Sequence, residues 1–185
     1  MPTSERRPLL DARALGLALH GMALDILKQT GTPATLVLVG IQRRGVELAA
    51  RLARVIAKQT GSEVPQGALD ITLYRDDLEA IGPRPVVGAT HLPVNLDGRH
   101  VWIVDDVLCT GRTVRAALDE LADFGRPARI GLAVLVDRGG RELPIQADVV
   151  GTQAELERGE RVEVMVSELD GRDAVEIARA ERVPV

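Results

Sequence analysis

The sequence predicts an α/β fold of one domain, with a mostly parallel, twisted sheet flanked by helices. Apolar runs of strand length alternate along the chain with segments of helical spacing, which is the pattern of parallel βαβ units. Aromatic residues make up only 2% of the chain although 45% of it is hydrophobic, so Leu, Val, Ile and Ala must build the core. Buried parallel sheets have this composition.

Length and charge narrow the class of protein further. The 185 residues are enough for one core, and we expect a single domain over 1–185. A net charge of −4 provides no overall attraction to nucleic acid or to anionic membranes, so anion binding must come from local clusters. No apolar stretch reaches the roughly 20 residues that span a bilayer, and no signal peptide precedes residue 8. We therefore expect a cytoplasmic protein without a membrane partner.

The first half of the chain contains two predicted strand–helix units. Helical spacing begins after Asp11, a suitable N-cap, and predicts a helix over 11–29. A short apolar strand over 36–39 then leads into a loop, and a second helix follows Gly45. The segment 68–74 has an extended pattern, whereas prolines and glycines remove any period from 75–92. We predict a flexible loop there.

The second half continues the alternation and then changes character. The pattern predicts a strand over 101–104, a helix over 113–124 and a strand over 130–136. Beyond these, apolar and polar residues alternate at 162–166, and Asp170-Gly171 precedes another short apolar run. This is typical of a β-hairpin, and we expect it to form an antiparallel edge of the sheet.

Two loops that follow predicted strands carry the residues best suited to bind a ligand. Ligands of open parallel sheets bind at the carboxyl ends of the strands. Asp105 and Asp106 end one strand, and hydroxyl residues with Gly follow at 110–113, where a helix begins. Carboxylates can accept hydrogen bonds from a ribose diol, and helix N-termini bind phosphate, so this loop indicates a ribose 5-phosphate site. The alternative is that the carboxylates only solvate the strand end and that Thr110 or Thr113 caps the helix.

The second loop, 40–45, places Arg43 and Arg44 at another strand end. Guanidinium groups bind phosphate oxygens in a bidentate manner, so a pyrophosphate is a plausible ligand. Taken alone, two such arginines are more often solvated surface, and only the neighbouring loop favours a binding role.

Three motifs resemble one family along most of the chain. They are DITLYRDDL at 70–78, VDDVLCTGRTVRAAL at 104–118, and the stretch from 125 to 145 that contains LAVLVDRGGRELPI. They are similar to type I phosphoribosyltransferases, and in particular to the bacterial pyrimidine operon attenuators that also have uracil phosphoribosyltransferase activity. The likeness covers about 10–177. It implies the fold of that family, with a flexible loop over 75–92 and a small hood.

The resemblance implies roles for particular residues. Arg75 would arrive on the flexible loop as a catalytic residue together with Asp105 and Asp106. The base would lie against Asp137, Arg138 and Val150. Pyrophosphate would bind the loop formed by Gly40, Ile41, Gln42, Arg43, Arg44 and Gly45. The ribose phosphate of 5-phosphoribosyl-1-pyrophosphate (PRPP) would bind Asp105, Asp106, Val107, Leu108, Cys109, Thr110, Gly111, Arg112 and Thr113.

The family's reaction supplies the other expectations. A uracil nitrogen displaces pyrophosphate from C1′ of PRPP through a cationic, oxocarbenium-like transition state and yields UMP. Mg²⁺ is carried by PRPP, so no direct protein ligand to the metal is expected. The implied partners are uracil, UMP or UTP as regulatory nucleotides, pyrimidine operon mRNA, and further copies of the chain in a homo-oligomer.

The sequence departs from the family where the base and RNA would bind. After Gly151 the family continues Lys-Asn-x-Pro-Thr-Ser, but this chain has an acidic, helix-compatible segment up to Gly159. Several positions that are usually polar or basic are replaced, and only scattered arginines remain. The replaced positions include Gly21, Leu24, Gln146 and Thr152. Two alternatives follow: a non-catalytic, nucleotide-sensing RNA-binding attenuator, and a phosphoribosyltransferase for another nucleobase.

Overall fold

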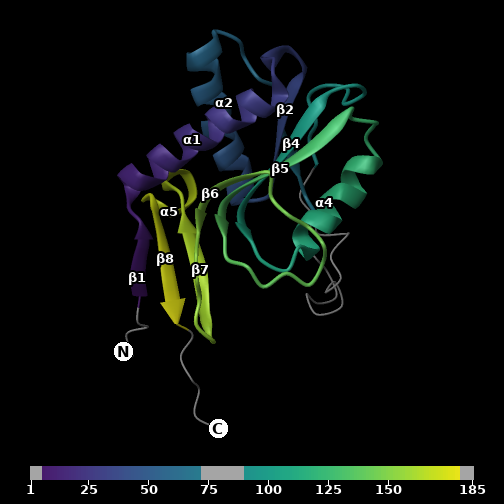
Figure 1. Ribbon diagram of the computed structural model, residues 1–185. Coiled ribbons are helices and arrows are strands. Elements are labelled where there is room, and N and C mark those ends of the chain that lie inside the picture. The colour runs from purple at the N-terminus through teal and green to yellow at the C-terminus, as the bar shows by residue number, and fades with distance from the viewer. Residues whose placement is uncertain (1–5, 72–89, 180–185) are drawn as a thin grey trace.

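The structure is a computed structural model that describes residues 6–71 and 90–179 (Figure 1). Arg75 and most of the predicted loop over 75–92 lie outside the described residues, so both remain predictions. Within the loop's described end, His91 forms an isolated bridge with Ala68. None of the helices in 6–71 and 90–179 is both long and apolar enough to cross a membrane.

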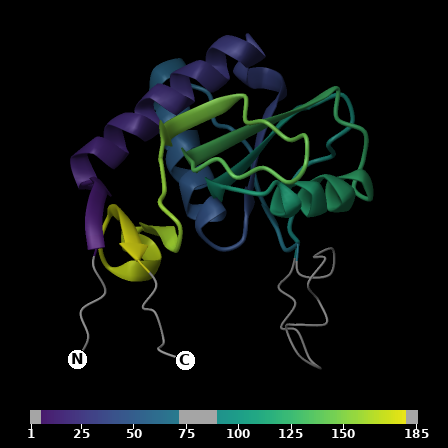
Figure 2. The same ribbon diagram turned by 60° about the horizontal axis from the view of Figure 1, so that its bottom comes forward.

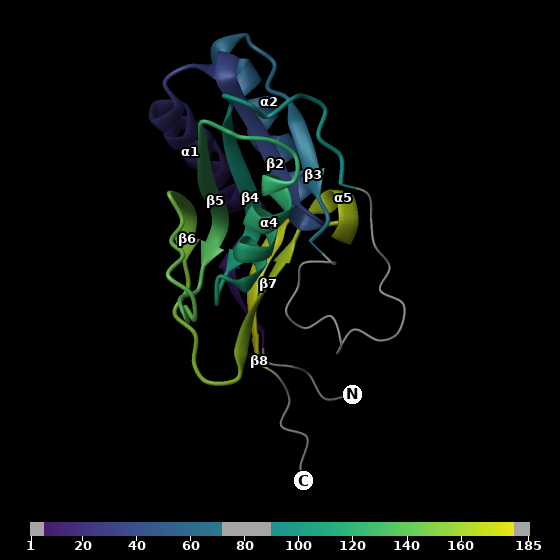
Figure 3. The ribbon, with the colours of Figure 1, turned by 90° about the vertical axis from the view of Figure 1, so that its right-hand side faces the viewer.

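The central layer is a parallel sheet of five strands in the order β3-β2-β4-β5-β6, and Figure 3 shows this order from one side of the molecule to the other. All four neighbouring pairs are parallel, as the alternation of strands and helices predicts. The strands are β2 (Leu36–Ile41), β3 (Gln66–Leu69), β4 (His100–Leu108), β5 (Arg129–Asp137) and β6 (Val149–Gln153).

Helices cover both faces of this sheet, so the molecule has three layers (Figure 2). One apolar cluster joins one face to α1 (Ala12–Thr30) and α2 (Arg44–Thr60). A second cluster joins the opposite face to α4 (Arg112–Ala122). A short 3₁₀ helix, η1 (Pro33–Thr35), leads into β2. Because the strands are covered on both faces, they are nearly continuous apolar runs, and every residue of β2 is buried.

Local contacts explain how two of these elements are placed. The Asp11 carboxylate accepts a hydrogen bond from the Ala14 N–H at 2.8 Å, which confirms it as the N-cap of α1. Trp102 is fully buried in β4, and its indole N–H donates to the Thr30 hydroxyl at 2.9 Å. A Cβ on Gly131 would come within 2.8 Å of the indole ring, so the neighbouring strand has space for this tryptophan only because Gly131 lacks a side chain.

A second, separate sheet contains three antiparallel strands in the order β1-β8-β7, and we call it the hood together with the short helix α5 (Ser167–Asp170). Its strands are β1 (Arg6–Leu10), β7 (Glu160–Met165) and β8 (Ala174–Arg179). The predicted hairpin is confirmed, but its placement at an edge of the main sheet is wrong. Because β8 pairs on its other side with β1, which the hydrophobic pattern does not reveal, the hairpin belongs to a sheet of its own.

The segment Gly151–Gly159 is also not the helix that its composition allows. Residues 151–153 complete β6 in parallel pairing with β5, and coil and a turn follow. A Cβ on Gly151 would lie 2.7 Å from the Leu135 carbonyl oxygen, so the close approach of the two strands requires glycine at this position. Pairing with β5 therefore overrides the local helix propensity of this segment.

Candidate active site

The two loops selected from the sequence converge at the carboxyl edge of the parallel sheet. β2 and β4 are neighbours, with Gly40 in register with Val104. A Cβ on Gly45 would lie 2.4 Å from the Val104 carbonyl oxygen, and one on Gly40 would lie 2.4 Å from the Gly45 carbonyl oxygen. The loop 40–45 therefore packs against the end of β4 through glycines that no larger residue can replace without a shift of the backbone.

The carboxylates of Asp105 and Asp106 are held at this edge by their own backbone. The Asp106 N–H donates to Asp105 Oδ1 at 2.9 Å, and the Val107 N–H donates to Asp106 Oδ1 at 2.8 Å. Asp105 is only 7% exposed. Burial raises the pKa of both carboxyls, and the neighbouring Asp106 charge raises the pKa of Asp105 further. Neither group forms an ion pair with the residues that the structure describes.

The loop after Asp106 ends at an uncapped helix. The N-cap of α4 is Gly111, at φ 92°, and no side chain accepts a capping hydrogen bond there. Thr110 accepts a hydrogen bond from the N–H of Arg112, the first residue of α4, at 3.3 Å, but neither Thr110 nor Thr113 is the N-cap, so the capping alternative holds only for this one N–H. An uncapped helix N-terminus presents backbone N–H groups and the positive end of the helix dipole, which suits a phosphate.

Not every side chain of the predicted phosphate loop is available to a ligand. Leu108 belongs to one apolar core cluster and Val107 packs against the other, so these two residues can offer only backbone atoms. The Arg112 guanidinium turns toward Glu142, with Nε 2.8 Å from its carboxylate. Cys109 is half-buried as a free thiol. The backbone of the loop is therefore its main binding element.

The two arginines of the loop 40–45 differ in exposure and in ion pairing. Arg43 is exposed and has no ion-pair partner in 6–71 or 90–179. Arg44, the first residue of α2, instead forms a bidentate pair with Asp170 of the hood. Ile41 is buried in the core, Gln42 is exposed, and the Gln42–Arg43 peptide bond is cis.

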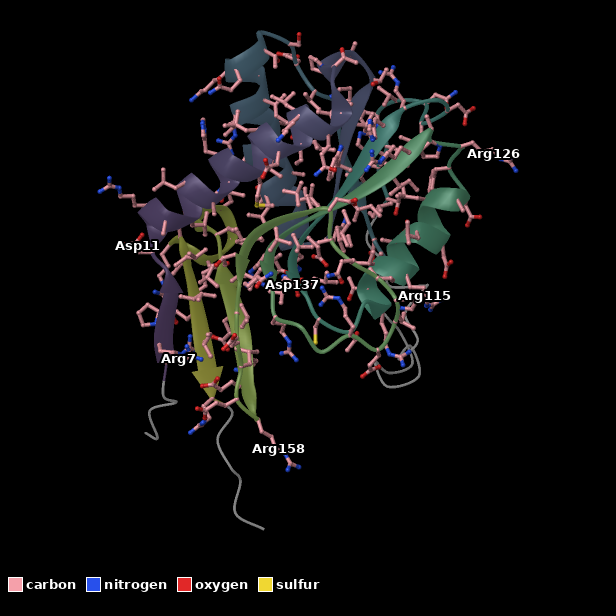
Figure 4. All side chains as sticks on the ribbon, in the orientation of Figure 1. Arg7, Asp11, Arg115, Arg126, Asp137 and Arg158 are labelled. Carbon is pink, nitrogen blue, oxygen red and sulfur yellow. The ribbon has the colours of Figure 1, made fainter. Side chains whose placement is uncertain are left out.

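A cavity of about 470 Å³ lies at the ends of β5 and β6, where the sequence predicts the base site. Asp137 and Arg138 line it as predicted, whereas Val150 packs against the core and is not among its lining residues. Figure 4 shows Asp137 between the parallel sheet and the hood, and Arg126 at the opposite end of the molecule. The other lining residues are Gly139, Arg141, Gln146, Gln153, Ala154, Glu155 and Leu156.

Arg141 is a residue of this site that the sequence does not assign to it. Its Nη2 donates to Asp137 at 2.6 Å, its Nη1 to the Cys109 carbonyl at 3.1 Å, and its Nε to the Ile145 carbonyl at 2.9 Å. The ion pair lowers the pKa of Asp137. Arg141 therefore links the phosphate loop to the cavity, and the only signal in the sequence is its position four residues after Asp137.

A family model confirms the class of protein that the fold and these loops define. The model described as "Phosphoribosyl transferase domain" matches residues 7–166. The chain therefore belongs to the phosphoribosyltransferase family.

Curated relatives place it within that family. The chain is 55% identical over 169 residues to the "Bifunctional protein PyrR" of Thermus aquaticus, which covers 91% of this chain and 93% of that protein. It is 54% identical to the protein of the same name from Chloroflexus aurantiacus, over 94% of this chain and 95% of the relative. At this identity and coverage the chain is a member of the PyrR group, as the motifs predict.

Solved structures confirm the fold independently. The hypoxanthine phosphoribosyltransferase of Staphylococcus aureus has a TM-score of 0.69 at 18% identity and covers 96% of this chain and 94% of its own. The enzyme of the same name from Trypanosoma cruzi has a TM-score of 0.70 at 20% identity, over 96% of this chain and 98% of its own. At such low identity these two structures establish the fold alone.

Proposed function

We propose that the protein transfers the phosphoribosyl group of PRPP to uracil, which produces UMP and pyrophosphate, and that it also regulates pyrimidine operon expression by binding mRNA in response to UMP or UTP. One observation carries the first half of the proposal. Asp105 is buried and Asp106 half-buried, neither has an ion-pair partner in the described residues, and both lie before a helix N-terminus whose N-cap makes no side-chain hydrogen bond. The PyrR relatives, which are named bifunctional, support both halves.

The carboxylate pair suits the cationic transition state of this reaction. Positive charge develops on the ribose as the bond from C1′ to pyrophosphate breaks, and nearby negative charge lowers the energy of that state. In the free protein the same charges are unfavourable, because the carboxyls are removed from water. The raised pKa of both carboxyls is the result. The ribose hydroxyls would donate hydrogen bonds to Asp105 or Asp106, while the N-terminus of α4 would hold the 5-phosphate.

The leaving pyrophosphate needs positive charge, which the chain offers in the loop 40–45. Arg43 is exposed there, and Arg75 would add a second guanidinium from the predicted flexible loop. The described residues hold no group of three or more potential metal ligands, but Asp105 and Asp106 are two adjacent hard oxygen donors. This donor set fits Mg²⁺ carried by PRPP, because Mg²⁺ is usually bound by one or two carboxylates plus substrate phosphates; either carboxylate would then be a direct ligand, which the family resemblance does not lead one to expect. When bound, Mg²⁺ would neutralise charge on the pyrophosphate.

The acceptor would enter the cavity between β5, β6 and the 138–146 segment. Gln146 and Gln153 line it, and a side-chain amide can both donate to and accept from the imide edge of a pyrimidine. Asp137 is held by Arg141 and by the Gly139 N–H, so it is fixed in place beside the base. These two amides are the basis for uracil as the proposed acceptor.

Incubation of the purified protein with PRPP, Mg²⁺ and one nucleobase at a time tests the enzymatic half. We expect pyrophosphate release with uracil and little with cytosine, adenine, guanine or hypoxanthine. Release with a different base would correct the acceptor only, whereas no release with any base would overturn the proposed activity and favour the non-catalytic alternative.

The regulatory half requires RNA contacts from a surface with few free cations. Arg129 lies 3.8 Å from Asp148, Arg141 pairs with Asp137, and Arg126 lies at the opposite end of the molecule (Figure 4). Because phosphate contacts supply most nonspecific RNA affinity, we expect binding that depends on assembly into a homo-oligomer. Filter binding of a pyrimidine operon leader RNA with and without UMP, paired with light scattering, tests this. Lack of UMP-dependent binding would refute regulation through RNA.

A further inference from the structure

The hood is attached to α2 by arginines that point from the helix to the α5 region. Arg51 is the central one, and its guanidinium donates to the carboxylates of Glu168 and Asp173. It also donates to the Ser167 hydroxyl at 2.9 Å, and the Asp173 carboxylate accepts from the Ser167 N–H at 2.7 Å. These contacts hold the short helix α5 against one side of α2, independently of the loop 40–45.

Arg44 makes the same connection at the N-terminus of α2, next to the pyrophosphate loop. Its Nη2 lies 2.8 Å from Asp170 Oδ1 and its Nε lies 3.2 Å from Asp170 Oδ2. Asp170 is fixed in turn, because its Oδ2 accepts a hydrogen bond from the Val166 N–H at 2.9 Å. The hood therefore holds the Asp170 carboxylate in place, and this carboxylate in turn holds the guanidinium of Arg44, the first residue of α2.

The pair leaves part of the guanidinium available. Arginine has five N–H donors, and Asp170 takes one on Nε and one on Nη2. The remaining three N–H groups, on Nη1 and Nη2, have no partner in 6–71 or 90–179, and the side chain is 37% exposed. Burial raises the pKa of Asp106, and the nearby positive charge of Arg44 opposes that rise. One edge of Arg44 is thus held by the hood while the other can meet an anion near the ribose carboxylates.

We propose that Asp170 is a positioning residue for pyrophosphate binding: it holds Arg44 side-on, so that the outer edge of the guanidinium meets the pyrophosphate of PRPP. The proposal rests on the proposed phosphoribosyl transfer. It assigns the hood a role in binding the donor. Asp170 itself touches neither substrate and acts only through Arg44.

The test combines Asp170→Asn with kinetics and direct binding. Asparagine keeps the shape of the side chain but loses the charge that orients Arg44, so we expect the KM for PRPP to rise about tenfold, the loss typical of one charge-assisted hydrogen bond, with a smaller change in kcat. Calorimetric titration with magnesium pyrophosphate, which needs no acceptor base, should show the same loss of affinity. In an Arg44→Gln background, Asp170→Asn should cause no further loss.

Asp173→Asn is the matched control, because it breaks the neighbouring Arg51 pair in the same contact between hood and helix. It should lower the melting temperature without raising the KM for PRPP. An equal rise in KM for both variants would mean general loosening of the hood and would overturn the proposal, as would an unchanged or lower KM for Asp170→Asn. Suppose that the wild type releases no pyrophosphate from PRPP, yet binds magnesium pyrophosphate with an affinity that falls in Asp170→Asn. This result would refute only the proposed reaction. A wild type that neither binds magnesium pyrophosphate nor releases pyrophosphate from PRPP would refute both the reaction and the role of Asp170.

Discussion

Acidic residues at the end of the parallel sheet and in the hood differ in what neutralises them. Asp105 is buried and Asp106 half-buried, neither has an ion-pair partner among the described residues, and removal from water raises the pKa values of both. In the hood, arginines from α2 and from the hood itself pair with the carboxylates and lower their pKa values, and for Glu160 the donating Glu157 N–H lowers the pKa more than Arg7 does. These lowered groups are Glu160, Glu168, Asp170, Asp173 and Glu176.

The difference separates carboxylates that are satisfied within the fold from carboxylates that are left open to a ligand. A carboxylate paired with arginine is satisfied in the free protein and holds two elements together, and in Asp170 the pair also orients the guanidinium of Arg44. A carboxylate removed from water without such a pair costs free energy, and we propose that for Asp105 and Asp106 the ligand supplies the missing charge. By the same criterion Arg43 is the unpaired cation of the loop 40–45 among the described residues, whereas Arg44 keeps only the outer edge of its guanidinium for a ligand.

The largest expected effect comes from Asp106→Asn, which removes an unpaired charge. We expect the rate of pyrophosphate release to fall roughly 100-fold or more, the size seen when one electrostatic group of a transition-state site is removed, while the melting temperature stays equal or rises. Glu176→Gln is the control, since that carboxylate pairs with Arg6 and Arg172 in the hood. It should leave the rate unchanged. Equal rates for Asp106→Asn and the wild type would contradict the assignment of the carboxylate pair.

Gly45→Ala tests the packing of the two loops against each other. The new methyl group would meet the Val104 carbonyl oxygen at 2.4 Å, so we expect a loss of about 1–3 kcal/mol in the free energy of unfolding, measured by urea denaturation. Gly21→Ala on α1 is the matched variant, because nothing lies within 4 Å of its added Cβ. It should stabilise the protein by up to about 1 kcal/mol. Similar unfolding curves for both variants would show that the approach of the loops is not tight.

Gln153→Ala probes the acceptor cavity separately from the donor site. If the amide contacts the base, the KM for uracil should rise roughly two- to tenfold, as for the loss of one neutral hydrogen bond, with the KM for PRPP unchanged. Steady-state kinetics with each substrate varied in turn measures both values. A change confined to the KM for PRPP would place Gln153 in the donor site instead.

The smallest expected effect is a difference in pH dependence. The folded-state pKa of Asp105 is raised above its ordinary 3.8, so the stability linked to its proton is complete below that value and is lost as pH rises through the folded value. The paired hood carboxylates have lowered pKa values and lose their contribution as pH falls. Thermal melts across pH should therefore show that the melting temperature declines less in Asp105→Asn than in the wild type as pH rises above 3.8. Parallel curves for the two proteins would indicate that folding does not raise the pKa of Asp105.

Much of the fold could be predicted because its elements depend on local pattern. Buried parallel strands are short apolar runs, and Asp11 caps its helix through atoms only three residues away. β1 could not be predicted, since it includes Pro8 and becomes a strand through pairing with β8 at the far end of the chain. For the candidate site, the sequence indicates the residues at 105–113 and 40–45, and their roles stay predictions; it does not indicate the partners of Arg44 and Arg141.

The sequence by itself determined the class of fold and which two loops follow its strands, because hydrophobic spacing and the residues that follow each strand are local properties of the chain. Only the tertiary structure decided which charges are already neutralised. Arg44 and Asp170 are 126 residues apart and meet because the hood folds back onto α2. Electrostatic pairing depends on distance in space, so it could be known only after the two sheets were placed.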